Sequence, residues 1–222
     1  MPSRMIHYLI AEKVAEQVKI KDLNRFKIGS LCPDMSLHTD DSKHQTHYVE
    51  IHGDKKGGNW LRFAKEYKEQ MKQDDLYLGI LCHLITDMIW FHEIMETQIR
   101  SQVKTKEERQ AKYNQGYVDF HKLNYLLREE FDLRYELKED RNIDFVGIHP
   151  ELYDDVFDGL FKDFFFEPRA EKKELTIYSY DITIKCIELC ITECVAAIKA
   201  FRKGKELLNP ETYFVPVYHM QK

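Results

Sequence analysis

The sequence contains little proline and glycine, with 6 and 9 of these residues among 222. Both residues interrupt regular structure and gather in turns and linkers, so their scarcity leaves no clear linker between domains. Sustained alternation of apolar and polar residues, the pattern of a half-buried strand, is also missing. We therefore predict one all-α domain over residues 1–222. It would be a multi-helix bundle with a main core at about 1–131, further helices at about 132–208 and a tail at 209–222.

The sequence also lacks an excess of basic residues, because it contains 33 Lys and Arg but 38 Asp and Glu, which gives a net charge of −5. This balance argues against general binding of nucleic acid or of anionic membranes, which requires a basic surface. The N-terminal segment has no apolar signal core followed by a small-residue cleavage site. The longest apolar run is too short to cross a bilayer, which takes about 20 residues. We expect a cytoplasmic protein without a transmembrane segment, and the sequence leaves its oligomeric state open.

The five cysteines indicate no disulfide framework, since their number is odd and cytoplasmic proteins rarely contain disulfides. Cys186, Cys190 and Cys194 recur at every fourth residue and would form one stripe of a helix. Such a stripe could bind a soft metal, but zinc sites rarely take three thiolates from one straight helix. We interpret the three residues as buried apolar thiols.

Helical periodicity recurs along most of the chain. Residues 35–58 are polar, contain four histidines and are predicted to form a long loop, and loops of that length in compact domains are often functional. Residues 104–112 form a charged stretch before a helix, and residues 143–149 could form a short extended piece. Helices are predicted at about 3–18, 23–31, 60–71, 75–100, 113–131, 150–166 and 177–204.

The most distinctive segment is the apolar run Leu76–Phe91, which carries His83 and Asp87 near its centre. A helix that is apolar all round is usually buried, and the i, i+4 spacing puts both polar side chains on one face. A buried carboxylate needs a cation or several donors, so the pair suggests a metal site. The simpler alternative is a core histidine hydrogen-bonded to its own carboxylate partner. Gly79 lies one turn before His83 and leaves space for an ion or for a neighbouring helix.

Further imidazole and carboxylate groups, which suit zinc or a similar divalent ion, lie in separate segments of the first 125 residues. Taken singly, each has an ordinary interpretation as a core, turn or solvated loop residue. Their coincidence favours a metal site between core helices. The candidate ligands are His7, Asp34, His47, His83, Asp87 and His121. Lys43 and His44 are candidates for binding a phosphate group.

Several motifs occur in a fixed order: MPSRMIH at residues 1–7, FKIGSLCPD at 26–34, KHQTHY at 43–48, YLGILCHLITD at 77–87 and YVDFHKLN at 117–124. This ordered set resembles the zinc-dependent phospholipase C family, and most closely its intracellular bacterial branch without a secretion signal. The resemblance spans roughly residues 1–130, and residues 132–222 carry no motif of the family.

The resemblance implies an all-α fold that holds up to three zinc ions and hydrolyses phosphodiesters. It also implies a catalytic role for Asp34, as the carboxylate that bridges metals or orients the attacking water. The ligands that it implies are His7, Asp34, His47, His83 and Asp87.

The sequence departs from the family pattern in two places. The secreted enzymes use their mature N-terminal amine as a ligand, and an unprocessed Met1 would be unable to do so. The family has a second His-x-x-x-Glu pair, whereas His121 is followed at that distance by Tyr125, with Asp119 or Asn124 as replacements. We therefore expect one or two ions, zinc or another divalent transition metal, with His121 facing the same cavity as Asp87. His92 would lie about 180° from His83 on a continuous helix and therefore outside the site.

These observations favour a metal-dependent phosphoester hydrolase that acts on a small phosphoester or phospholipid-like substrate. At such sites zinc lowers the pKa of water to about 7. The alternative is a non-catalytic protein, either a metal-stabilised helical scaffold or a ligand-binding module, which the missing second carboxylate favours. A nuclease or nucleotidase with the same metal chemistry is a third possibility. The acidic balance disfavours long polyanions, but not mononucleotides.

Overall fold

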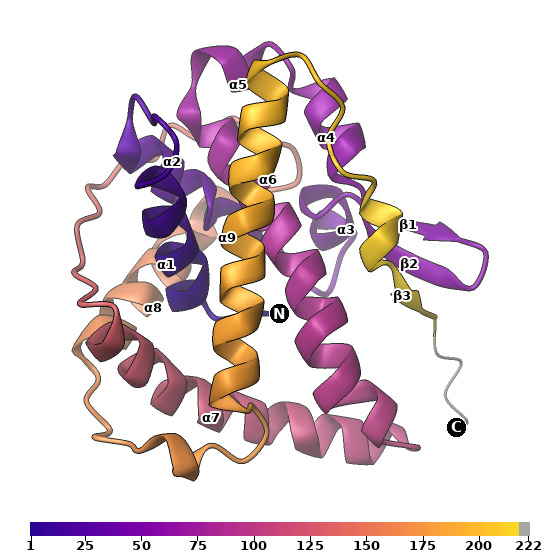
Figure 1. Cartoon of the computed structure of the whole chain (residues 1–222), viewed down its shortest axis with the longest axis vertical. Helices are drawn as coiled ribbons and strands as arrows, with labels where there is room; N and C mark the ends of the chain where they lie inside the picture. Colours follow the sequence, from indigo (N-terminus) through magenta and orange to yellow (C-terminus); the bar gives the residue numbers. More distant parts are fainter. Residues whose placement is uncertain (218–222) are drawn as a thin grey trace.

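The computed structural model describes residues 1–217 and is built mainly of helices, as predicted (Figure 1). The α-helices are α1 (Arg4–Ala15), α2 (Leu23–Gly29), α3 (Ser42–Thr46), α4 (Trp60–Glu66), α5 (Gln70–Gln73), α6 (Asp75–Trp90), α7 (Lys106–Glu130), α8 (Tyr153–Phe165) and α9 (Tyr180–Arg202). A π-helical segment, η2 (Phe91–Glu96), continues α6. Short 3₁₀ turns are η1 (Cys32–Asp34), η3 (Arg100–Gln102), η4 (Pro150–Leu152), η5 (Lys172–Glu174) and η6 (Pro210–Tyr213). The organisation as a single domain stays a prediction.

Helix α6 runs through the interior of the fold, with α2 and α9 packed against it (Figure 1). Asp74 caps its first turn by accepting a hydrogen bond from the Leu76 N–H at 2.9 Å. Every residue from Asp75 to Trp90 is buried, as expected of a helix that is apolar on all faces. Within residues 1–217, Asp75–Gln102 is the one stretch long and apolar enough to cross a membrane, and 83% of its most apolar window is buried inside the protein. The protein's own core therefore covers this apolar surface.

Helices α2 and α6 approach closely where Gly29 faces Gly79. A Cβ atom on Gly79 would lie 2.1 Å from the Phe26 carbonyl oxygen, and one on Gly29 would lie 1.9 Å from the Leu76 carbonyl oxygen. Neither position can accept a side chain unless the two helices separate. The space beside Gly79 is therefore filled by a neighbouring helix, and not by an ion.

Residues 35–58 contain more regular structure than the predicted loop. Besides α3, they form an antiparallel hairpin of β1 (Val49–His52) and β2 (Lys55–Gly58), which turns at Gly53 with a φ of 63°. The strand β3 (Val215–Pro216) pairs with the other edge of β2 and places the C-terminal part of the chain beside this hairpin (Figure 1). The prediction without strands was wrong here, because Lys and Gly have low strand propensity and backbone pairing decides the conformation of β2.

Helix boundaries also differ from the prediction. The helix predicted over 60–71 is divided into α4 and α5, and the helix predicted over 75–100 changes to π geometry after Trp90. The charged residues 104–112 lie mostly within α7, which begins at a capping box formed by Thr105 and Glu108. Residues 143–149 form no strand. Of the predicted tail, residues 218–222 lie outside the described residues.

The cysteine stripe of α9 faces the core. Cys186, Cys190 and Cys194 are buried free thiols, and the Cys194 thiol donates to the Cys82 carbonyl of α6 at 3.6 Å. Burial raises the pKa of Cys190 well above its usual value, which keeps this thiol neutral. The interpretation of the stripe as buried apolar thiols is confirmed.

Candidate metal centre

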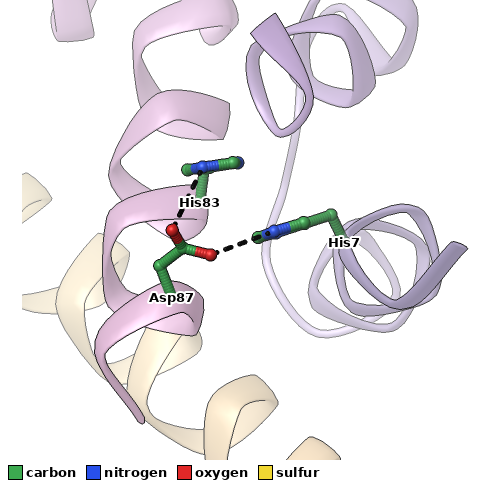
Figure 2. A group of neighbouring side chains, drawn as sticks. All are labelled: His7, His83 and Asp87. Carbon is green, nitrogen blue, oxygen red and sulfur yellow. Dashed lines mark ion pairs between the residues drawn. The ribbon is translucent and has the colours of Figure 1, made fainter. Parts of the chain in front are cut away.

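Helices α1 and α6 bring His7, His83 and Asp87 together in the core (Figure 2). His83 and Asp87 lie one turn apart on α6, and His7 approaches from α1. The Asp87 Oδ1 atom lies 3.3 Å from His7 Nε2, and Oδ2 lies 3.8 Å from His83 Nε2. The rings of His7 and His83 stack with their centroids 4.1 Å apart. Asp87 therefore presents one carboxylate oxygen to each of two stacked histidines.

His47 and Asp34 join this cluster from the segment between α2 and β1. His47 Nε2 lies 3.3 Å from Asp87 Oδ2, 3.3 Å from His83 Nε2 and 3.7 Å from Asp34 Oδ1. Asp34 ends the turn η1, and His47 directly follows α3. Five of the predicted ligands, which come from four separate segments, thus meet in one place.

The donors form two overlapping groups, defined by ligand atoms that all lie within 4.8 Å of one another. One group is His7, His83 and Asp87, and the other is Asp34, His47 and His83. Each group offers two imidazoles and one carboxylate, a donor set found in catalytic zinc sites. Because His83 belongs to both groups, it lies at the centre of the cluster.

Two neighbouring oxygens orient the central histidines. His83 Nδ1 lies 2.9 Å from the Ser30 carbonyl oxygen, which can only accept, so Nδ1 carries the proton and the Nε2 lone pair faces the cluster. His47 Nδ1 lies 2.8 Å from the Thr46 hydroxyl, which donates to the Lys43 carbonyl and can accept from the ring. These two partners were not predicted. Ser30 follows the close contact at Gly29, and Thr46 directly precedes His47.

Burial and neighbouring charges set the protonation of the cluster. Burial, followed by the proximity of His7, lowers the pKa of His83 to about 3, so this ring is neutral at pH 7. Burial opposes ionisation of Asp87, but the neighbouring histidines outweigh it and hold the pKa of that carboxyl well below its usual range. Burial also opposes ionisation of Asp34, but the neighbouring His47, His83 and Lys43 outweigh this effect and lower the pKa of the Asp34 carboxyl. Neutral imidazole and ionised carboxylate are the forms that bind a metal.

Some buried polar atoms of the cluster have no hydrogen-bond partner, and they indicate whether its residues fit a cation. Among the described residues, His7 Nδ1, His7 Nε2 and Asp87 Oδ1 have no hydrogen-bond partner, although all three atoms are buried. A buried polar atom without a partner costs about 1–3 kcal/mol. A divalent cation between the imidazole and the carboxylate would satisfy His7 Nε2 and Asp87 Oδ1 together, so the residues present fit zinc.

The cluster opens into a pocket of about 300 Å³, whose wall includes His47 and Asp87. The predicted phosphate-binding residues Lys43 and His44 also line this pocket, and Lys43 Nζ lies 3.6 Å from Asp34 Oδ1. Met1 lines it as well. Its α-amino group is buried near Asp87 and Asp34, and burial lowers the pKa of this amine, which favours its neutral form. The pocket therefore joins the metal ligands to groups that can bind an anion.

His121 does not join the cluster, so that prediction was wrong. It is exposed on α7, and its ring packs edge-on against Phe166 with the centroids 5.4 Å apart. The helix buries a different face, made of Gly116, Asp119, Phe120, Leu123, Asn124 and Leu127.

The residues considered as replacements for the missing glutamate have structural roles. Asp119 accepts hydrogen bonds from the backbone N–H groups of residues 176, 177 and 178, and Asn124 accepts one from the Ser3 hydroxyl at 2.6 Å. His92 lies outside the cluster, as predicted, with its Nδ1 atom 2.8 Å from a Glu93 carboxylate oxygen.

Comparison with known families agrees with this cluster. The family profile for zinc dependent phospholipase C matches residues 6–191. The chain belongs to the zinc-dependent phospholipase C family. The match includes both ligand groups and continues into α9, so membership of this phospholipase C family extends well beyond residues 1–130. Comparison with curated proteins and with solved structures gives no significant match. The family is zinc-dependent, and the two His/Asp groups of this member are able to hold the ion.

Proposed function

We propose that the protein is a zinc-dependent phosphoester hydrolase that acts on a small phosphoester or a phospholipid-like substrate. The observation that carries the proposal is the pair of ligand groups that share His83 and open into a pocket with Lys43 beside it. Membership of the phospholipase C family supports hydrolysis as the reaction. The donor set alone would equally suit a metal that only stabilises the fold, so the adjoining pocket is what favours catalysis.

The chain's own residues have separate roles in this reaction. When bound, zinc supplies a Lewis acid that polarises a phosphoryl oxygen and acidifies water near neutral pH. Asp34, which neighbours such as His47 and Lys43 hold ionised, accepts a hydrogen bond from the attacking water and orients it. Lys43 places a cation where negative charge develops on the phosphoryl oxygens. Ser30 and Thr46 hold the rings of His83 and His47 in place.

The test uses protein purified without added metal, with its zinc content measured by elemental analysis. We expect it to hydrolyse at least one of bis(p-nitrophenyl) phosphate, p-nitrophenyl phosphate, a mononucleotide and a short-chain phospholipid at neutral pH. A chelator should abolish turnover, and zinc should restore it. A zinc-loaded sample that is inert toward the whole panel would overturn the proposal in favour of a scaffold. Two observations favour the scaffold: His121 is exposed, and Tyr125 stands where the family has a second carboxylate.

A further inference from the structure

The pocket continues past the ligand cluster toward the β-hairpin and β3. Beyond His47 and Asp87, one part of its wall is apolar and includes Leu84, Met88 and Phe91 from α6 and η2. Val215 of β3 also lines the pocket. Such a wall suits the carbon skeleton of a ligand whose phosphate lies at the cluster.

The lysines of this wall lie outside the ligand cluster, whereas its carboxylate belongs to the cluster. Lys43 and Lys56 line the pocket together with His38 and His44, and burial lowers the pKa of His38, which favours its neutral form. Among the described lining residues the one carboxylate is that of Asp87. A pocket that selects a cationic head group, such as choline, would need a carboxylate or an open aromatic face outside the metal site. The ring of Phe91 already carries the Arg100 guanidinium 5.0 Å from its centroid, and the wall instead offers the cations Lys43 and Lys56.

Lys56 lies at the end of the pocket formed by the strands. It is half-buried on β2, where it pairs with Ile51 of β1 and with Val215 of β3. Burial lowers the pKa of Lys56, and the nearby cations Arg100 and Arg109 lower it further. No ion pair joins Lys56 to a carboxylate within residues 1–217. The strand therefore holds the Lys56 ammonium next to apolar side chains and near other cations. Binding of an anionic ligand group would be favourable there.

Building on the proposed function, we propose that the pocket selects phosphoesters that carry a second anionic group, and that Lys56 is the specificity-determining residue that binds this group. The scissile phosphate would lie at the ligand cluster beside Lys43, the carbon skeleton against the apolar wall, and the second anion at Lys56. Both an anionic phospholipid head group and a small soluble phosphoester with a carboxylate or second phosphate have this chemistry. A zwitterionic choline ester does not.

The test compares two ligands that share a phosphate monoester, 3-phosphoglycerate with an added carboxylate and phosphocholine with an added cation. Their binding to the zinc-loaded protein is measured by titration calorimetry. We expect 3-phosphoglycerate to bind at least about tenfold more tightly, which is about 1.4 kcal/mol. Lys56→Met should reduce this preference to within about threefold, and Lys56→Arg should retain it. Lys55→Met is the matched control, because Lys55 is the exposed neighbour on the same strand and does not line the pocket.

Several outcomes would overturn the inference: equal or tighter binding of phosphocholine, a preference that survives in Lys56→Met, or no binding of either ligand. Melting curves and zinc content must match the unmodified protein, and Lys56→Gln replaces Lys56→Met if that variant misfolds. If neither neutral variant folds, the unmodified protein is titrated at increasing ionic strength. Its preference for 3-phosphoglycerate over phosphocholine must then shrink if that preference is ionic. Turnover of short-chain phosphatidylglycerol against phosphatidylcholine, and of soluble diesters, separates the lipid from the soluble substrate. Turnover without a Lys56-dependent preference would sink this inference and leave the proposed function intact.

Discussion

At the scale of single residues, Asp87 is the side chain that lies close to all three histidines of the cluster. Its two oxygens lie 3.3–3.8 Å from His7, His47 and His83. Asp87→Asn keeps the size of the side chain but removes the charge that offsets a cation. We expect zinc affinity to fall by more than about 100-fold, beyond the range typical of residues that only orient a ligand. Competition with a chromophoric chelator measures this affinity.

Asp75→Asn is the matched control for that experiment. Asp75 is also a buried carboxylate of α6, but it accepts hydrogen bonds from the backbone N–H groups of Lys21 and Asp22 at 2.6 and 2.7 Å. Its replacement should lower the free energy of unfolding and leave zinc affinity within about threefold. Equal loss of zinc affinity in both variants would mean that Asp87→Asn acts by disturbing the structure and not by removing a zinc ligand.

Asp34→Asn should separate catalysis from metal binding. The other group of ligands, His7, His83 and Asp87, does not include Asp34 and should keep its ion. A residue that orients the attacking water contributes about 10²–10⁴-fold to rate, so we expect kcat to fall by at least about 100-fold with zinc still bound. Retained kcat would exclude Asp34 from the reaction.

His83 should make the metal-free protein sensitive to acid. Its pKa is about 3 in the folded protein and about 6.5 when unfolded, so between these values the unfolded chain binds more protons. Stability from this residue is complete above about pH 6.5 and is lost as the pH falls toward 3, by about 1.4 kcal/mol for each pH unit. His47, whose pKa is raised, contributes with the opposite sign around its own pKa.

Urea unfolding of chelator-treated protein between pH 7.5 and 4.5 measures this loss. The unmodified protein should lose stability relative to His83→Gln as the pH falls. His92→Gln, which changes a histidine outside the cluster, should keep the full pH dependence. Parallel curves for the unmodified protein and His83→Gln would contradict the prediction.

At the scale of secondary-structure elements, the contact between α2 and α6 positions the metal ligands. Gly79→Ala would place a methyl group 2.1 Å from the Phe26 carbonyl oxygen and 2.8 Å from the Ser30 nitrogen, both backbone atoms. The helices must then separate, which moves the Ser30 carbonyl away from His83. We expect a loss of about 1–3 kcal/mol of stability, together with weaker zinc binding, measured by urea unfolding and chelator competition.

Gly159→Ala is the control for this effect, because its methyl group would meet only the end of the Arg4 side chain, at 2.3 Å. A flexible side chain can move away, and alanine favours the helix by about 1 kcal/mol over glycine. We expect unchanged zinc affinity and equal or higher stability. Comparable destabilisation by both substitutions would show that the loss is not specific to the contact between α2 and α6.

Sequence patterns predicted the elements whose environment depends mainly on their own residues. The apolar composition of 76–91 predicted a buried helix, and the i, i+4 spacing placed His83 and Asp87 on one face. The convergence of His7 and His47 with them followed from the family resemblance, since spacing in sequence carries no information on distance between segments. His121 was misplaced because the tertiary packing of α7, anchored by Asp119, decides which face is buried. The hairpin was missed because the residues of β2 have low strand propensity, and the pairing of β2 with Val215 lies far away in the sequence.

At the scale of the whole molecule, zinc binding contributes to folding stability. An ion that binds the folded protein adds RT ln(1 + [L]/Kd), or about 2.7 kcal/mol at 100 times Kd. For a chain of this length, 1 kcal/mol shifts Tm by about 2–4 °C. We expect a chelator to lower Tm by roughly 5–10 °C, measured by differential scanning calorimetry. Asp87→Asn should melt at the same temperature with and without the chelator, and a chelator-sensitive Asp87→Asn would point to a different site for the ion.

Met1 and Val215 line the same pocket although they lie near opposite ends of the described chain. All five clustered ligands precede residue 88, whereas the residues of β3 are translated after them. A nascent chain that has emerged past α6 already carries every clustered ligand and Lys56, while Val215 of β3, which completes the pocket wall beside Lys56, is translated later. The capacity to capture zinc and the capacity to hold a substrate therefore arise at different moments of translation.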